Sequence, residues 1–272
     1  MQRAWVTTNV LDLWSRPQFE SERRSQLVFS EIVSVEKSSK GFSFVRQSDG
    51  YSGWADTRFL SPLKGGNAER KSRAQDAFVV ATAARLWSDD RKTTVRPHLV
   101  YYGTVLKVQS NHNNFSRIIL PDGRHCFVKT GAVRPIIRRK GLPVAGFRLV
   151  AEARRFLGAP YLWGGVTSAG FDCSGLVRAV CARFGIYLPR DTKDQISMGE
   201  RIERDCIKNG DLLFFKRHVG FAIGSSHIIH ASRGSGGVRV DALEPGLTDY
   251  RQDLDRDFAQ ARRITTCSTC NP

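Results

Sequence analysis

No segment of the sequence is apolar for long enough to cross a membrane as a helix, since no run of eighteen apolar residues occurs. The N-terminus also lacks the apolar segment and the small-residue cleavage site of a secretory signal. These two absences exclude a helical membrane protein. They lead us to expect a cytoplasmic location and no membrane partner.

The cysteines show no regular spacing of the kind that a disulfide framework requires. A lone CxxC motif ends the chain, and a structural zinc site usually needs a second ligand pair, which the sequence lacks. We therefore expect no metal and no cofactor. The six cysteines are Cys126, Cys173, Cys181, Cys206, Cys267 and Cys270.

Acidic residues are the minority among the charged ones, with 26 Asp and Glu against 42 Lys and Arg, and the net charge is +16. Such a chain favours anionic partners. The basic residues are spread along the sequence, however, so we expect a solvated basic surface and no nucleic-acid site. A length of 272 residues allows two or three domains with packed cores.

The N-terminal half contains an internal repeat. Leu13–Ser15 recurs as Leu86–Ser88, and Asp49–Gly50 returns as Asp122–Gly123, each at an offset of 73 residues (87 − 14 and 123 − 50). Two copies of this size indicate a duplicated small domain, because a solenoid needs at least three stacked units.

Each copy shows short strand patterns separated by turn residues. In the first copy, the strand patterns at 32–35 and 42–45 precede a strong hairpin signal at Asp49–Gly50. This pattern predicts a small β-barrel of five or six strands. We place the two barrels at residues 1–63 and 75–137.

A loop rich in glycine and aromatic residues precedes the candidate catalytic residues in the C-terminal half. It runs from Tyr161 to Asp172, and an apolar period of 3.6 residues follows it. Asp172 therefore occupies an N-cap position, and Cys173 falls in the first helical turn. Unpaired backbone N–H groups and the helix dipole stabilise an anion there, so we expect Cys173 to be a thiolate.

Two histidines follow on predicted strands. His218 begins one strand pattern and His230 lies in the next, which favours one shared face beside the Cys173 helix. A reactive thiol needs a base, and the base needs a third group that orients it. We assign these roles to Cys173, His218 and His230, with a ring-to-ring hydrogen bond between the histidines. A helix at 147–157, the Cys173 helix and later strands predict an α+β catalytic domain at 145–265.

The motif Phe171–Leu176, followed by His218–Gly220 and His230–Ala231, resembles the NlpC-type cysteine peptidases of the bacterial cell wall. The two N-terminal copies resemble bacterial SH3-like domains, the second less closely. The resemblance implies two SH3-like β-barrels followed by a papain-like α+β catalytic domain.

The resemblance also implies an activity. The expected enzyme is a cysteine endopeptidase that cuts between γ-D-glutamate and a diamino acid, usually meso-diaminopimelate, in peptidoglycan stem peptides or muropeptides. We expect it to act as a monomer in wall remodelling or recycling. The family pattern adds Tyr161 as an oxyanion donor, and Asp172, Ser174, Trp163 and Glu31 as substrate-binding residues.

Three alternatives remain open. A Cys–His–His zinc site shares the ligand types but needs a fourth ligand. A catalytically inactive domain would leave a protein that binds peptidoglycan or another anionic polymer. Acyl transfer by the same thiol is the third alternative.

Overall fold

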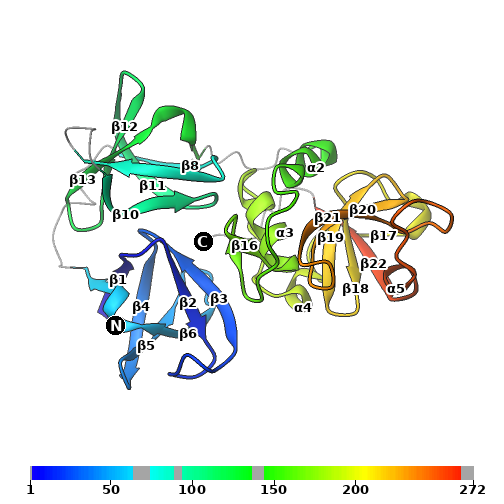
Figure 1. Cartoon of the computed structure of the whole chain (residues 1–272), viewed down its shortest axis with the longest axis horizontal. Coiled ribbons are helices and arrows are strands. Elements are labelled where there is room, and N and C mark those ends of the chain that lie inside the picture. The colour runs from blue at the N-terminus through cyan, green and yellow to red at the C-terminus, as the bar shows by residue number, and fades with distance from the viewer. Residues whose placement is uncertain (1, 64–73, 89–93, 137–143, 265–272) are drawn as a thin grey trace. The chain divides into compact units, whose positions relative to one another are not determined.

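The computed structural model describes residues 2–63, 74–88, 94–136 and 144–264. The chain divides into two compact units, 1–137 and 138–271. Sheets dominate both units and helices are few (Figure 1). The terminal CxxC motif lies outside the described residues.

Unit 1 consists of two seven-stranded antiparallel sheets, each with a 3₁₀ helix before its last strand. The first sheet contains β1 (Gln2–Val6), β2 (Val10–Trp14), β3 (Arg23–Val28), β4 (Ile32–Ser39), β5 (Phe42–Arg46), β6 (Ser52–Asp56), η1 (Thr57–Phe59) and β7 (Leu60–Pro62). The second contains β8 (Gln75–Val79), β9 (Ala83–Trp87), β10 (Thr94–Tyr101), β11 (Val105–His112), β12 (Phe115–Ile119), β13 (His125–Lys129), η2 (Thr130–Ala132) and β14 (Val133–Pro135).

The two sheets share one topology. The strand order is β3-β2-β6-β5-β4-β1-β7 in the first and β10-β9-β13-β12-β11-β8-β14 in the second. The register repeats as well, because the pair Trp14–Trp54 recurs as Trp87–Phe127 at the same offset of 73. The internal repeat predicted from the sequence is therefore confirmed as a repeat of structure.

Closure into a barrel is not confirmed for either copy. Among the described strands of the first copy, β3 pairs only with β2 and β7 pairs only with β1, so the strand order does not return to its start. The SH3-like assignment stays a prediction.

Within the described residues, unit 2 combines a six-stranded antiparallel sheet, ordered β17-β22-β18-β19-β20-β21, with two longer helices, α2 and α3, and with shorter elements. Its elements are α2 (Gly146–Arg154), β15 (Val166–Thr167), β16 (Gly170–Phe171), α3 (Cys173–Ala182), α4 (Thr192–Gln195), β17 (Glu200–Ile202), η3 (Arg204–Cys206), β18 (Leu212–Phe215), β19 (His218–Ile223), β20 (His227–Ser232), β21 (Gly237–Ala242), α5 (Gln252–Arg256) and β22 (Phe258–Arg263).

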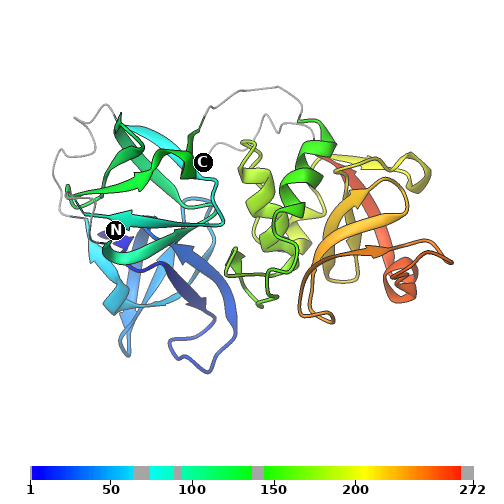
Figure 2. The same cartoon turned by 45° about the horizontal axis from the view of Figure 1, so that its top comes forward.

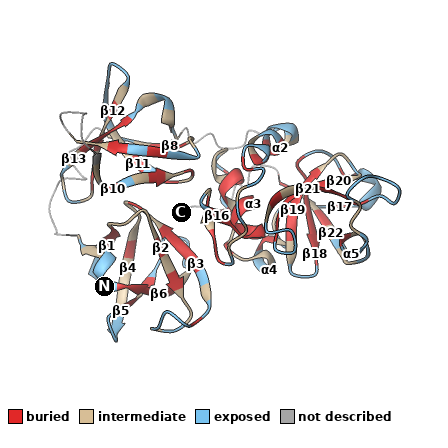
Figure 3. Ribbon diagram, viewed as in Figure 1, coloured by how far each residue is buried: buried red, intermediate tan, exposed pale blue. Residues whose placement is uncertain are grey.

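Helices α2 and α3 pack on each other and on strands β19 and β20 (Figures 1 and 2). These central strands are almost wholly buried, as Figure 3 shows, because the helices cover them. The arrangement places the N-terminus of α3 beside the start of β19. The predicted order of helix, loop, Cys helix and strands is confirmed.

One boundary prediction is wrong. The helix expected at 147–157 ends at Arg154, and Leu157 is exposed beyond it. The charged segment 249–264 holds only the short helix α5 and then becomes β22, which pairs with both β17 and β18. Sheet pairing outweighs the weak local helix propensity of this charged segment.

Candidate active site

Asp172 starts helix α3 as the sequence predicts. Its backbone is extended (φ −90°, ψ 176°), and its carboxylate accepts a hydrogen bond from the Gly175 N–H at 2.7 Å. Gly175 allows the loop to approach, since a Cβ there would lie 2.1 Å from the Gly165 carbonyl oxygen. The capped start makes Cys173 the first residue of the helix.

The Cys173 thiol is buried in this corner. Its sulfur lies 3.8 Å from the Thr192 hydroxyl, and the backbone N–H groups of Val219 and Ser174 also point to it. Burial raises the pKa of Cys173, and the neighbouring Asp172 charge raises it further. The amides and the hydroxyl oppose this shift without reversing it. The expectation of a resting thiolate is therefore wrong, because desolvation outweighs the helix N-terminus.

The two histidines meet as predicted. His218 Nε2 lies 2.6 Å from His230 Nδ1, which confirms the ring-to-ring hydrogen bond. Gly220, two residues after His218 on β19, leaves the necessary space, because a Cβ there would lie 2.8 Å from the His230 Cβ. His218 directly precedes Val219, whose amide contacts the Cys173 sulfur. The two imidazole rings thus lie next to the backbone that contacts the Cys173 sulfur.

Asp241 extends this chain and was missed by sequence reasoning. Its Oδ2 lies 2.9 Å from His230 Nε2, and the side chain is fully buried on β21. Burial alone would raise its pKa, but the His230 hydrogen bond and the charges of Arg239 and Arg251 lower it overall. Asp241 is therefore a carboxylate. An acidic residue in the strand 237–242 was visible in the sequence. Its contact with His230, however, depends on how β20 and β21 pair, which the sequence does not specify.

This network assigns the tautomers. Ionised Asp241 only accepts, so His230 Nε2 carries a proton and His230 Nδ1 accepts from His218 Nε2. His218 Nδ1 is then the free basic nitrogen. Burial lowers the pKa of His218 most, to about 3, and the neighbouring His230 ring and the charge of Arg251 act in the same direction. The resting site holds a neutral thiol and a neutral imidazole.

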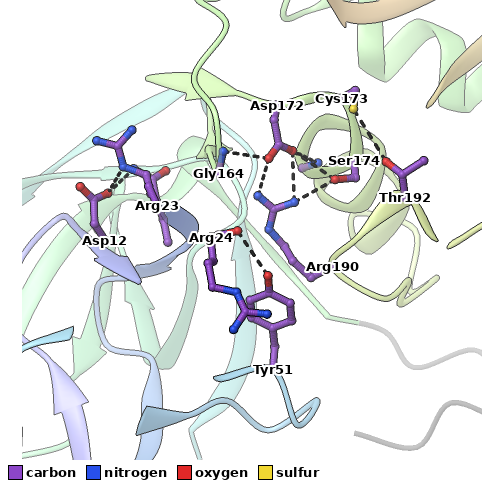
Figure 4. Close-up of polar contacts among 12 residues, drawn as sticks. Asp12, Arg23, Arg24, Tyr51, Gly164, Asp172, Cys173, Ser174, Arg190 and Thr192 are labelled. Carbon is purple, nitrogen blue, oxygen red and sulfur yellow. Dashed lines mark hydrogen bonds and ion pairs between the residues drawn. The ribbon is translucent and has the colours of Figure 1, made fainter. Parts of the chain in front are cut away.

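Arg190 is a second residue that sequence reasoning missed. Its guanidinium donates to both carboxylate oxygens of Asp172, at 2.5 and 3.1 Å, and to the Ser174 hydroxyl at 2.9 Å (Figure 4). Arg190 is 3% exposed, so this is a buried ion pair. Gly164 N–H also donates to Asp172 at 3.0 Å. The Asp172 carboxylate thus accepts hydrogen bonds from the Arg190 side chain and from two backbone N–H groups.

The remaining predicted site residues fall in two places. Tyr161 is half-buried, and burial, with Asp172 nearby, raises its pKa, so its hydroxyl stays a donor. Trp163 is 51% exposed. Glu31 belongs to unit 1, where its carboxylate accepts from the Val28 N–H and from Gln47 Nε2, at 3.0 and 2.6 Å. The roles expected for these residues stay predictions.

Neither a metal-binding cluster nor a membrane-spanning helix occurs in the described part of the chain. No group of three or more His, Cys, Asp and Glu side chains is arranged there to hold a metal ion. No helix within those ranges is both long enough and apolar enough to span a membrane.

The chain is similar in sequence to known bacterial peptidases and to one protein family. The model of the NlpC/P60 family matches residues 158–256. A probable endopeptidase NlpC homolog of Haemophilus influenzae is 33% identical over 140 residues, which cover 50% of this chain and 73% of that protein. A gamma-D-glutamyl-L-lysine dipeptidyl-peptidase of Bacillus cereus is 28% identical over 283 residues, covering 95% of this chain and 80% of the relative.

The fold agrees with the crystal structure of an NlpC/P60 family protein from Bacillus cereus. The TM-score is 0.82 at 22% identity, over 96% of this chain and 99% of that one. At this identity the match establishes the fold alone, including the N-terminal sheets.

Proposed function

Because this chain belongs to the NlpC/P60 family, we propose that it is a cysteine peptidase that hydrolyses the γ-D-glutamyl–diamino acid bond of peptidoglycan stem peptides. The Bacillus cereus relative is named for a γ-D-glutamyl-L-lysine bond, which supports this bond class. The resemblance seen in the sequence points to meso-diaminopimelate as the diamino acid.

The hydrogen-bonded chain His218–His230–Asp241 carries the proposal. His218, the first residue of this hydrogen-bonded chain, lies on β19, and the backbone amide of the next residue, Val219, contacts the Cys173 sulfur. The proposed nucleophile on α3 and the proposed base on β19 therefore lie close together. Such a chain serves covalent catalysis, in which a base activates the thiol and a buried carboxylate stabilises the imidazolium. All the proposed groups come from unit 2.

The reaction starts from the neutral pair. As the Cys173 sulfur attacks the scissile carbonyl carbon, its proton moves to His218 Nδ1. The new positive charge is shared with His230 and balanced by Asp241. The imidazolium then gives the proton to the leaving amine of the diamino acid, and the thioester remains. Water, deprotonated by the same His218 nitrogen, releases the γ-carboxylate and restores the thiol.

The developing oxyanion needs donors that are already in place. We propose the Cys173 backbone N–H, at the free N-terminal end of α3, and the Tyr161 hydroxyl. The raised pKa of Tyr161 keeps that hydroxyl protonated. It can therefore donate to the oxyanion across the working range of pH.

For substrate binding, we propose that Asp172 and Ser174 contact the free amine of an N-terminal L-alanine and that Trp163 lines the pocket. Arg190 already balances the charge of Asp172. We therefore expect weaker selection for a free amine than an unpaired buried carboxylate would give. We further propose that the two N-terminal copies are SH3-like, and that the protein acts as a monomer without nucleic acid.

The direct test uses the tripeptide L-Ala-γ-D-Glu-meso-diaminopimelate and its L-lysine analogue, with products separated by chromatography. Cys173→Ala should abolish cleavage of both, whereas Cys206→Ala, which removes an exposed thiol of the same unit, should retain it. Equal cleavage by Cys173→Ala and the unmodified chain would refute the assignment of the nucleophile. Binding without cleavage by the unmodified chain would favour an inactive binding protein.

A further inference from the structure

The second copy of unit 1 contains a groove of about 740 Å³. This volume lies within the range of small-molecule sites in proteins, roughly 300–1,000 Å³. The groove lies between strands β9 and β13 and the turn η2. The side chains that matter for its chemistry are Arg85, Trp87, Asn114, Lys129 and Thr130.

The first copy provides an internal control, because its residues correspond at an offset of 73. Arg85 and Lys129 stand where the first copy has Asp12 and Asp56. The register pairs Trp14 with Trp54 in one copy and Trp87 with Phe127 in the other, so each charged pair lies across two neighbouring strands. The two copies therefore carry opposite charges at one corresponding place on the sheet.

The first copy neutralises its two acids internally. Arg23 lies 2.9 Å from Asp12, and Arg58 lies 2.6 Å from Asp56. The charge at this place is thus balanced within the chain. No exogenous ion is needed to hold these strands together.

The second copy differs. Continuing the Trp87–Phe127 register by two residues places Arg85 opposite Lys129. Like charges opposite each other on neighbouring strands are destabilising. Within the described residues, no acidic side chain forms an ion pair with either of them. The position of Arg58 is taken by Gly131, and that of the large Phe59 by Ala132. Loss of these two side chains opens the space in which an anion would balance the cations.

An aromatic surface adjoins the two cations. Trp87 is half-buried and packs edge-on against Phe115, with ring centroids 6.5 Å apart. An indole beside cations and polar side chains is suited to a ligand with a flat apolar face and a charge at one edge. Asn114 and Thr130 add polar groups for hydroxyl or amide partners.

We propose that this groove binds a saccharide that carries a carboxylate, with the sugar ring on Trp87 and the carboxylate between Arg85 and Lys129. A nucleic acid would require a track of cations along its phosphates. The groove instead holds two cations around one indole. The site lies wholly within unit 1, and it does not depend on the proposed peptidase activity.

The test is a titration of the full-length ¹⁵N-labelled chain followed through the tryptophan indole N–H signals. The probes are N-acetylmuramic acid, which has a carboxylate, and N-acetylglucosamine, which has none. Trp87→Phe identifies the Trp87 signal. Addition of N-acetylmuramic acid should shift that signal, and Arg85→Gln or Lys129→Gln should each weaken binding roughly tenfold.

Arg3→Gln is the matched control, since Arg3 is an exposed arginine on a strand of the first copy and loses the same charge. It should bind as the unmodified chain does, and so should Cys173→Ala. Equal affinity for N-acetylglucosamine would overturn the carboxylate assignment. Tighter binding of a single-stranded oligonucleotide at the same signal would overturn the saccharide assignment, and no shift of the Trp87 signal with either sugar would overturn the site.

Discussion

Replacement of Asp241 by Asn tests the relay most sharply, because it keeps the shape of the side chain and removes its charge. His230 Nε2 would still have an oxygen acceptor at about the same place. The imidazolium that forms during attack would lose its counter-charge. A hydrogen bond to a charged group contributes about 1.5–3 kcal/mol and a neutral one about 1 kcal/mol. The difference, about 0.5–2 kcal/mol, predicts kcat roughly 2- to 30-fold lower.

The assay compares kcat and KM of Asp241→Asn with those of Asp249→Asn on the same tripeptide. Asp249 is the matched control, because it also pairs with Arg239 but is largely exposed and does not contact His230. Removal of a buried charge also leaves Arg239 and Arg251 less well paired, so circular dichroism must verify folding of both variants. If folded Asp241→Asn has the kcat of Asp249→Asn, the relay reasoning is wrong.

Three further predictions rest on individual contacts. Gly220→Ala should lower both kcat and the melting temperature, because its Cβ would lie 2.8 Å from that of His230; unchanged values would contradict the need for a glycine there. Arg190→Lys should lower the free energy of unfolding in urea by about 1–3 kcal/mol, since an ammonium cannot replace the bidentate contact with Asp172, and a loss near zero would contradict this. His218 has a folded pKa of about 3, below its ordinary value of 6.5, so the unfolded chain binds this proton first as pH falls. His218 should therefore contribute a loss of stability of about 1.4 kcal/mol per pH unit between pH 6.5 and about 3, and no slope outside that window; in urea melts the slope should be shallower in His218→Gln.

Much of the catalytic half was predictable because its signals are local. The N-cap at Asp172, the helix period after Cys173 and the strand patterns around His218 and His230 each depend on neighbours in sequence. The repeat of unit 1 was equally visible, because the strand order follows the same 73-residue spacing as the sequence matches. Barrel closure, in contrast, depends on which edge strands meet, and local patterns do not specify this.

The sequence by itself determined that a cysteine stands at a helix start, with two histidines on later strands. Only the tertiary structure decided the protonation of that cysteine, because burial in the corner of α3 and β19 outweighs the helix terminus. It also brought in Asp241 and Arg190, which lie 11 and 18 residues from the groups they contact. Strand register and loop packing select such partners, and both are properties of the folded chain.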